Sequence, residues 1–134
     1  DSSLLSACGT LSEANTTYTL QNNISTDGTC FNITANNITL DFAGFFINDT
    51  SPAKSEYGVT TAYNYTTVLN GYIYDFGRGI DCSGNNGNFT NLTIEANADY
   101  GIGSSAYGVY ITGDNNYISD KNRYLNIGSY KNMC

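Results

Sequence analysis

The chain is 134 residues long, 40% of its residues are hydrophobic, and its formal net charge is −7, with five Lys and Arg and no His. So few basic side chains argue against nucleic-acid binding and against attraction to an anionic membrane surface, since both need clustered Lys and Arg. No apolar run approaches the roughly 18 residues that would indicate a membrane span.

The composition favours strands over helices. Gly and Asn are abundant, only 13% of residues are charged and there is one Pro, which is typical of β-strands joined by tight turns. No stretch of ten residues combines a 3.6-residue apolar period with helix caps. We therefore expect one all-β domain that spans residues 1–134.

Residues 1–30 are expected to form an N-terminal cap and the first strands. The chain begins at Asp1 without Met, which predicts a processed mature form. The segment "DSSLLSACGTL" either covers one end of the core or donates Leu4 and Leu5 as a strand to a neighbouring molecule.

The stretch "CFNITANNITLDFAGFFI", residues 30–47, contains the glycan acceptor triplet N-I-T twice. Alternation along a strand points successive side chains to opposite faces, so Asn32 and Asn37 are predicted to face outward. Asn36 lies outside any sequon and is expected at a structural corner. The residues expected to point inward are Phe31, Ile33, Ile38 and Leu40.

Residues 31–120 contain an internal repeat of apolar alternation, a small polar turn, an Asn and renewed alternation. The segments begin at Phe31, Val59, Ile80 and Val109, and the aligned Asn are Asn36, Asn64, Asn88 and Asn116, with spacings of 28, 24 and 28 residues. Such a repeat predicts a solenoid of about four to five coils whose apolar faces stack. The alternative is an antiparallel β-sandwich with irregular hairpins. Residues 121–134 form a short polar and aromatic C-terminal tail.

The four cysteines are Cys8, Cys30, Cys82 and Cys134. Without His or a C-x-x-C pair, disulfides in an oxidising, extracellular setting are a better interpretation than a zinc site. Three pairings are possible, of which we favour Cys8–Cys30 together with Cys82–Cys134. Free buried thiols, and a bond from Cys134 to a neighbouring subunit, remain alternatives.

Four short motifs carry a family resemblance. They are "CGTL" at 8–11, "YTL" at 18–20, "GTCF" at 28–31 and "NITLDFAG" at 37–44. With them the chain resembles the right-handed parallel β-helix, or pectate-lyase-like, superfamily, and most of all its branch in archaeal-type cell-surface proteins. The resemblance implies a right-handed β-helix with a Cys8–Cys30 disulfide near its N-terminal end. The opening motifs cover residues 8–47, and the looser repeats continue to about residue 120.

The sequence holds eight N-x-S/T sequons, which predict covalent N-linked glycans and an extracellular or cell-surface location. Asn64 and Asn88 fall on the proposed corner positions, so they are the least suited to carry sugar. No other cofactor and no metal is expected. The eight acceptors are Asn15, Asn23, Asn32, Asn37, Asn48, Asn64, Asn88 and Asn91.

The sequence lacks a convincing catalytic constellation. Enzymes of the resembled fold use clustered Asp with a His, or Ca²⁺-binding carboxylates with a basic residue. The nearest match is "DFGRGID", with Asp75, Arg78 and Asp81. A surface ion pair at a corner is the preferred interpretation of these three residues, and we predict that the chain is not an enzyme.

These features together predict an extracellular structural protein. A short β-helix without a clear second cap exposes strand edges, which favours end-to-end self-association into a filament or coat. One alternative is a carbohydrate-binding surface module that uses some of the twelve tyrosines. A second alternative is a polysaccharide lyase-like enzyme.

Overall fold

The structure is a computed structural model that describes residues 1–52, 56–95, 107–119 and 123–125. Every regular element in these ranges is a β-strand, which confirms the all-β prediction for this part of the chain. The strands are β1 (Ser2–Leu5), β2 (Gly9–Leu11), β3 (Thr17–Leu20), β4 (Ile24–Thr26), β5 (Phe31–Ile33), β6 (Thr39–Asp41), β7 (Phe46–Asp49), β8 (Tyr57–Thr61), β9 (Thr67–Tyr74), β10 (Arg78–Cys82), β11 (Asn88–Glu95), β12 (Tyr107–Ile111), β13 (Tyr117–Ile118) and β14 (Arg123–Leu125).

The strands form two sheets, and every strand pair in the described part of the chain is parallel. The smaller sheet has the order β2-β5-β8-β10-β12, and the larger runs β1-β3-β6-β9-β11-β13, with β4, β7 and β14 beside it. The alternative of an antiparallel sandwich is therefore wrong for these strands.

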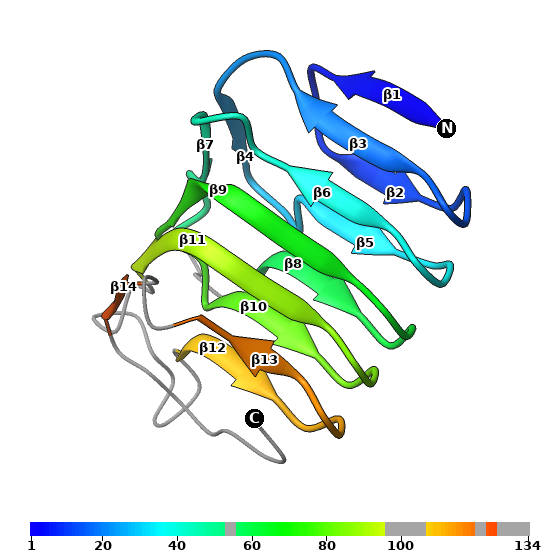
Figure 1. Ribbon diagram of the computed structural model, residues 1–134. Coiled ribbons are helices and arrows are strands. Elements are labelled where there is room, and N and C mark those ends of the chain that lie inside the picture. The colour runs from blue at the N-terminus through cyan, green and yellow to red at the C-terminus, as the bar shows by residue number, and fades with distance from the viewer. Residues whose placement is uncertain (53–55, 96–106, 120–122, 126–134) are drawn as a thin grey trace.

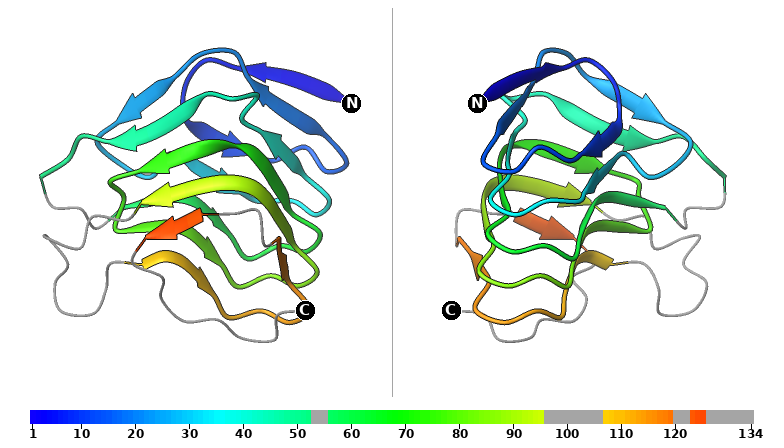
Figure 2. Two further views of the ribbon diagram at one scale, coloured as in Figure 1. Left: turned by 60° about the vertical axis from the view of Figure 1, so that its left-hand side comes forward. Right: turned by 90° about the vertical axis from the view of Figure 1, so that its right-hand side faces the viewer.

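The chain alternates between the two sheets, so that it passes through both of them five times (Figures 1 and 2). We call each passage a tier. The tiers are β2–β4, β5–β7, β8–β9, β10–β11 and β12–β14, while β1 extends the larger sheet beyond the first tier.

Inward-pointing side chains from successive tiers stack in columns and build one core. Each column joins register-matched residues that are at most 5% exposed. Apolar residues fill these positions because burial away from water is favourable, and β-branched side chains suit the pleated surface. One column is Phe31, Val59, Ile80 and Val109, another is Leu40, Val68 and Phe89, and a third is Ile24, Ile47, Ile73 and Ile94.

The alternation predicted for residues 30–47 is confirmed. The four apolar residues expected to point inward, Phe31, Ile33, Ile38 and Leu40, are at most 1% exposed. Asn32 and Asn37 are exposed on the outer surface. This stretch is therefore a wall of the core on one side and a polar surface on the other.

A polar turn links each smaller-sheet strand to the next strand of the larger sheet, and these turns stack along one side of the molecule (Figure 1). The Asn64 backbone N–H donates to Asn36 Oδ1 (2.9 Å), the Asn85 N–H to Asn64 Oδ1 (2.9 Å), and the Asp114 N–H to Asn85 Oδ1 (2.7 Å). We call these four residues the corner ladder. The residue after each of them has a positive φ between 57° and 61°. The corner position predicted for Asn36 is confirmed.

For two of the four Asn that were aligned in the sequence repeat, the predicted corner position is wrong. Asn88 pairs with Thr67 at the start of β11 and is exposed, so Asn85 takes the corner position instead. Asn116 lies two residues beyond Asp114 and is fully buried, where its Oδ1 accepts the Gly87 N–H (2.7 Å). The tiers differ in length, with 28, 21 and 29 residues between corner residues, whereas the predicted Asn are 28, 24 and 28 residues apart.

The predicted Cys8–Cys30 disulfide is present, with an S–S distance of 2.07 Å across a sequence separation of 22 residues. It joins the residue before β2 to the residue before β5, and so ties the first two tiers together. The second predicted pairing differs from the structure, because Cys82 is a buried free thiol. Cys82 lies in register with Thr61 and points into the core. Cys134 lies outside the described residues, as do positions 126–133 of the tail.

No helix long and apolar enough to cross a membrane occurs in the ranges that the structure describes.

Candidate functional site

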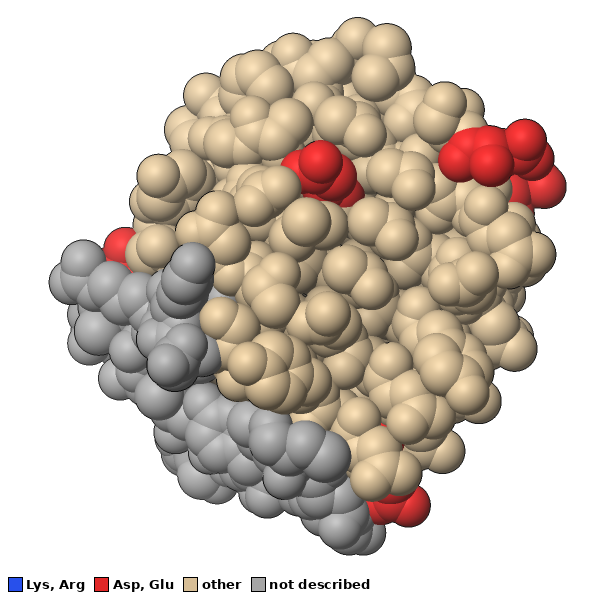
Figure 3. All heavy atoms as spheres, in the orientation of Figure 1, with Lys and Arg blue, Asp and Glu red and all other residues tan. Residues whose placement is uncertain are grey.

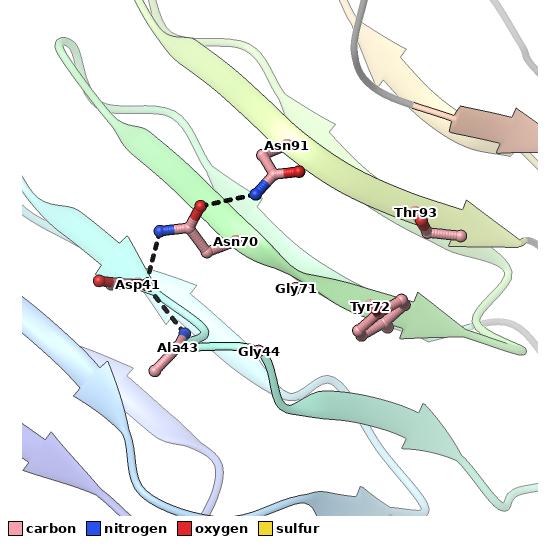
Figure 4. A pocket seen from close by; sticks show the side chains of 8 residues that line it. All are labelled: Asp41, Ala43, Gly44, Asn70, Gly71, Tyr72, Asn91 and Thr93. Atoms are coloured by element: carbon pink, nitrogen blue, oxygen red, sulfur yellow. Dashed lines mark hydrogen bonds between the residues drawn. The ribbon is translucent and has the colours of Figure 1, made fainter.

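A groove of about 290 Å³ lies on the outer surface of the larger sheet, where its strands bend (Figure 4). Its residues come from three successive tiers, which means that no single segment of sequence forms it. The lining residues are Asp41, Ala43, Gly44, Asn70, Gly71, Tyr72, Asn91 and Thr93.

The bend that creates the groove depends on positive φ angles. Asn70 (φ 64°) and Asn91 (φ 53°) occupy equivalent positions in β9 and β11, and Asn tolerates this left-handed conformation better than most residues. Beneath them Phe42 is fully buried, and a Cβ on Gly71 would lie 2.1 Å from the Phe42 Cβ. Gly71 therefore lets the strand pass directly over a core aromatic ring.

One wall of the groove is a row of three polar side chains, Asp41, Asn70 and Asn91, which we call the amide row (Figure 4). Asn91 Nδ2 donates to Asn70 Oδ1 (2.9 Å), and Asn70 Nδ2 donates to Asp41 Oδ1 (3.3 Å). The Ala43 backbone N–H also donates to Asp41 Oδ1 (2.8 Å). A carboxamide nitrogen carries two hydrogens, and one on each Asn is used within the row.

The opposite wall holds Tyr72 and Thr93, which are neighbours in register on β9 and β11. The Tyr72 side chain is 41% exposed. Its ring stacks on Tyr74 with centroids 6.0 Å apart and an interplanar angle of 26°, and Tyr74 packs in turn against Phe46. These contacts restrict the Tyr72 ring, so it presents a defined apolar face to the groove.

The groove combines an aromatic face with amide, hydroxyl and carboxylate groups. A pyranose ring has the complementary surface, with apolar C–H groups on its faces and hydroxyls around its edge. With Asp41, Asn70, Asn91 and Thr93 in its lining, the groove is more polar than the usual small-ligand site, which is mostly apolar. The surface shown in Figure 3 is otherwise largely uncharged, with acidic residues in separate patches and no Lys or Arg visible among the described residues. The groove thus offers one aromatic face, several hydrogen-bonding groups and one carboxylate, that of Asp41.

The sequons lie on the molecular surface. Asn48 and Asn64 are half-buried and the other six acceptors are exposed. Asn64 Oδ1 accepts the Asn85 N–H in the corner ladder, so the structural role predicted for Asn64 is confirmed. The exposed acceptors are Asn15, Asn23, Asn32, Asn37, Asn88 and Asn91.

The acceptor side chains of Asn23 and Asn48 also bond to a neighbouring tier through oxygen. Asn23 Oδ1 accepts the Phe46 N–H (3.0 Å), and Asn48 Oδ1 accepts the Ser25 hydroxyl (2.6 Å). Glycosylation replaces a hydrogen on Nδ2 and leaves Oδ1 in place. These contacts are therefore compatible with attached sugar.

Arg78 and Asp81 form an ion pair, as expected, with 3.0 Å between Arg78 Nη1 and Asp81 Oδ1. The Arg78 guanidinium also lies over the Tyr110 ring, 4.0 Å from its centroid, which favours this position through a cation–π contact. Asp75 has a positive φ of 69° and its N–H donates to the Glu95 carbonyl (2.8 Å). None of the three lines the groove.

Sequence reasoning did not identify Asp41, Asn70 or Tyr72 as site residues. One local signal was available, since the Asn-Gly pair at 70–71 marks a sharp change of chain direction. Nothing local indicates that this bend lies beside Asp41 and Asn91, which are 29 and 21 residues away.

The part of the chain that the structure describes contains no group of three or more His, Cys, Asp or Glu that could hold a metal ion. No family model, curated protein or solved structure matches the chain. Its function is therefore inferred from the geometry of the described residues.

Proposed function

We propose that this protein is an extracellular, N-glycosylated and disulfide-stabilised structural protein with a right-handed parallel β-helix fold, and that copies stack end to end into a surface filament or coat. Strands that alternate between two parallel sheets support the β-helix. Parallel crossover connections are right-handed in about 98% of known cases, which supports the hand.

The open edge of β2 carries the assembly proposal. The Gly9 N–H donates to the Cys30 carbonyl, and the Leu11 carbonyl accepts the Thr34 N–H. Alternate residues of a parallel strand bond to opposite neighbours, so the N–H and C=O of Thr10 face away from β5. Within the described ranges no strand pairs with that side of β2, and unpaired strand edges recruit further strands.

The two edges of the smaller sheet are suited to each other. Among the described strands β2 forms one edge and β12 the other, and all five strands are parallel. A β12 placed beside the β2 of a second copy would continue the sheet with the same strand direction. Contacts between different surfaces of identical subunits generate open filaments when they do not close into rings.

Although they are short, the end strands β1 and β2 lack two of the usual devices that prevent edge association. Neither β1 nor β2 contains Pro or a charged residue, which are common means of blocking edges. Leu4 in β1 is 67% exposed. These features favour contact with another molecule at this end.

The disulfide and the exposed sequons support the extracellular location. Disulfides persist in oxidising compartments, and Cys8–Cys30 is formed. N-linked sugars are attached to secreted and surface proteins.

Thr10→Pro tests the assembly. It removes the outward-facing N–H of β2 and breaks none of the bonds that Gly9 and Leu11 make to the second tier. We expect filaments of the native chain by negative-stain microscopy and their loss in Thr10→Pro with unchanged circular dichroism. Thr10→Val is the matched control because it keeps the N–H and the side-chain shape. Monodisperse monomers of the native chain at high concentration would refute the assembly.

A carbohydrate-binding surface module is the second candidate function, and the groove favours it. Selective binding of one sugar on a glycan array, lost in Tyr72→Ala, would support this candidate.

A further inference from the structure

The first and third residues of one sequon line the groove. In Asn91-Leu92-Thr93 the acceptor Asn and the hydroxyl residue are both lining residues. Leu92 between them is 2% exposed and points into the core, so it holds the other two outward. Asn91 and Thr93 are the only sequon residues among those that line the groove.

Asn91 and Tyr72 are separated by about the length of one sugar. Asn91 and Asn70 both lie between the register pairs Thr90–Leu69 and Leu92–Gly71, and Thr93 pairs with Tyr72. With strands about 4.8 Å apart and about 3.3 Å per residue, the Cα atoms of Asn91 and Tyr72 lie about 8 Å from each other. This separation is comparable to the span of one pyranose ring joined to the Asn91 amide.

We propose that the groove holds the first sugar of an N-linked glycan on Asn91 of the same chain. The inference rests on the proposed function, which includes N-glycosylation. The sugar face packs on Tyr72, and its hydroxyls lie beside the Asn70 amide and the Asp41 carboxylate.

Attachment is compatible with the amide row. The reaction joins Asn91 Nδ2 to the anomeric carbon of a phosphate-linked sugar donor, the carbon–oxygen bond to the phosphate breaks, and the phosphate leaves with that electron pair while one Nδ2 proton is released. The second Nδ2 hydrogen remains. It can keep the 2.9 Å bond to Asn70 Oδ1.

A tethered sugar suits this groove better than a free one. The groove is open and small, and Tyr72 is the one aromatic residue among its lining residues, so contact with a free monosaccharide is limited. A short covalent link raises the effective concentration of the sugar to about the millimolar range. The same weak contacts can then order a sugar that is already attached.

Asn88 provides a matched control acceptor. It lies on the same strand and is exposed, and the third residue of its sequon, Thr90, is a Thr as in the Asn91 sequon. It does not line the groove. Global unfolding exposes both acceptors equally, so a difference between them reports the groove.

The test uses the full chain secreted from a host that attaches N-linked glycans. Glycopeptide mass spectrometry gives the occupancy of Asn88 and Asn91, and an enzyme that cleaves the Asn–sugar bond is then applied to the folded protein. We expect release from Asn91 to be about three- to tenfold slower than from Asn88, in line with the strength of one aromatic contact. Tyr72→Ala should remove the difference. Tyr63→Ala, whose native side chain is 42% exposed against 41% for Tyr72, should not.

Three results would overturn the inference. They are equal release rates in the native chain, an empty Asn91 beside an occupied Asn88, and binding of a free monosaccharide by the unglycosylated chain with a Kd below about 1 mM, or −4.1 kcal/mol, which Tyr72→Ala abolishes. The first two leave glycosylation and assembly intact. Sugar on none of the sequons would instead refute the glycoprotein part of the proposed function as well.

Discussion

The corner ladder and the amide row use similar residues for different purposes. In the corner ladder, the side-chain oxygens of Asn36, Asn64 and Asn85 each accept a backbone N–H of the next tier. In the amide row, side chains bond to one another and line an open groove. A side chain that replaces a missing backbone partner is structural, because its loss leaves a polar backbone group unpaired. In the amide row Asp41 also accepts the Ala43 N–H, whereas Asn70 and Asn91 each keep one Nδ2 hydrogen that the row does not use.

The glycines beside these two regions should show the largest contrast. Gly84 precedes Asn85 of the corner ladder, and a Cβ there would lie 1.8 Å from the Tyr63 carbonyl oxygen. Gly84→Ala must push two backbones apart, and we expect a loss of more than about 3 kcal/mol of unfolding free energy. Gly44 lies beside the amide row, where a Cβ would meet no atom within 4 Å and only the φ of 89° is unfavourable.

Gly44→Ala should accordingly cost about 1 kcal/mol. Urea unfolding of both variants measures the difference. Equal losses would show that tiers in the corner are not packed as closely as the structure indicates.

Cys82 extends the comparison to the core beneath the corner ladder. Its thiol lies 3.6 Å from the Gly84 carbonyl oxygen. Burial raises the pKa of Cys82 from its ordinary value of 9.0 to about 11, and the nearby Asp81 carboxylate adds to this effect while the contact with Gly84 opposes it. The folded protein therefore favours the neutral thiol.

The sign of the pH effect follows from that shift in pKa. Below pH 9 both folded and unfolded Cys82 are protonated and this group adds no pH dependence. Between pH 9 and pH 11 the unfolded thiol ionises first, so the unfolding free energy should fall by up to roughly 3 kcal/mol. Subtracting the pH profile of the Cys82→Ala variant from that of the native chain isolates the contribution of Cys82. Parallel profiles would contradict the buried thiol.

The smallest expected difference in unfolding free energy is between two side-chain truncations, one in the corner ladder and one in the amide row. Asn64→Ala removes the acceptor of the Asn85 N–H, and we expect a loss of about 1–2 kcal/mol. Asn70→Gly keeps the positive φ of 64° accessible and removes only side-chain bonds, so the loss should stay below about 1 kcal/mol. Thermal and urea unfolding measure both. A larger loss for Asn70→Gly would mean that the amide row also holds the tiers together.

The sequence by itself determined which side chains build the wall. The period of two is a local property of an extended chain, so Phe31, Ile33 and Leu40 could be assigned to the core from their neighbours alone. Asn36 could be assigned to a corner because Asn suits the sharp turns that follow each strand. The Cys8–Cys30 pair followed from a motif resemblance, and the structure contains it.

Only the tertiary structure decided which residues meet across tiers. "GNNGN" at 84–88 offers three Asn for one corner position. Hydrogen bonds between backbone N–H groups and side-chain oxygens of the third to fifth tiers select Asn85. The Cys82 side chain points into the core because Cys82 pairs in register with Thr61. The groove brings together Asp41, Tyr72 and Asn91 because three tiers of unequal length bend at corresponding positions along the larger sheet. Contacts between the tiers set those positions.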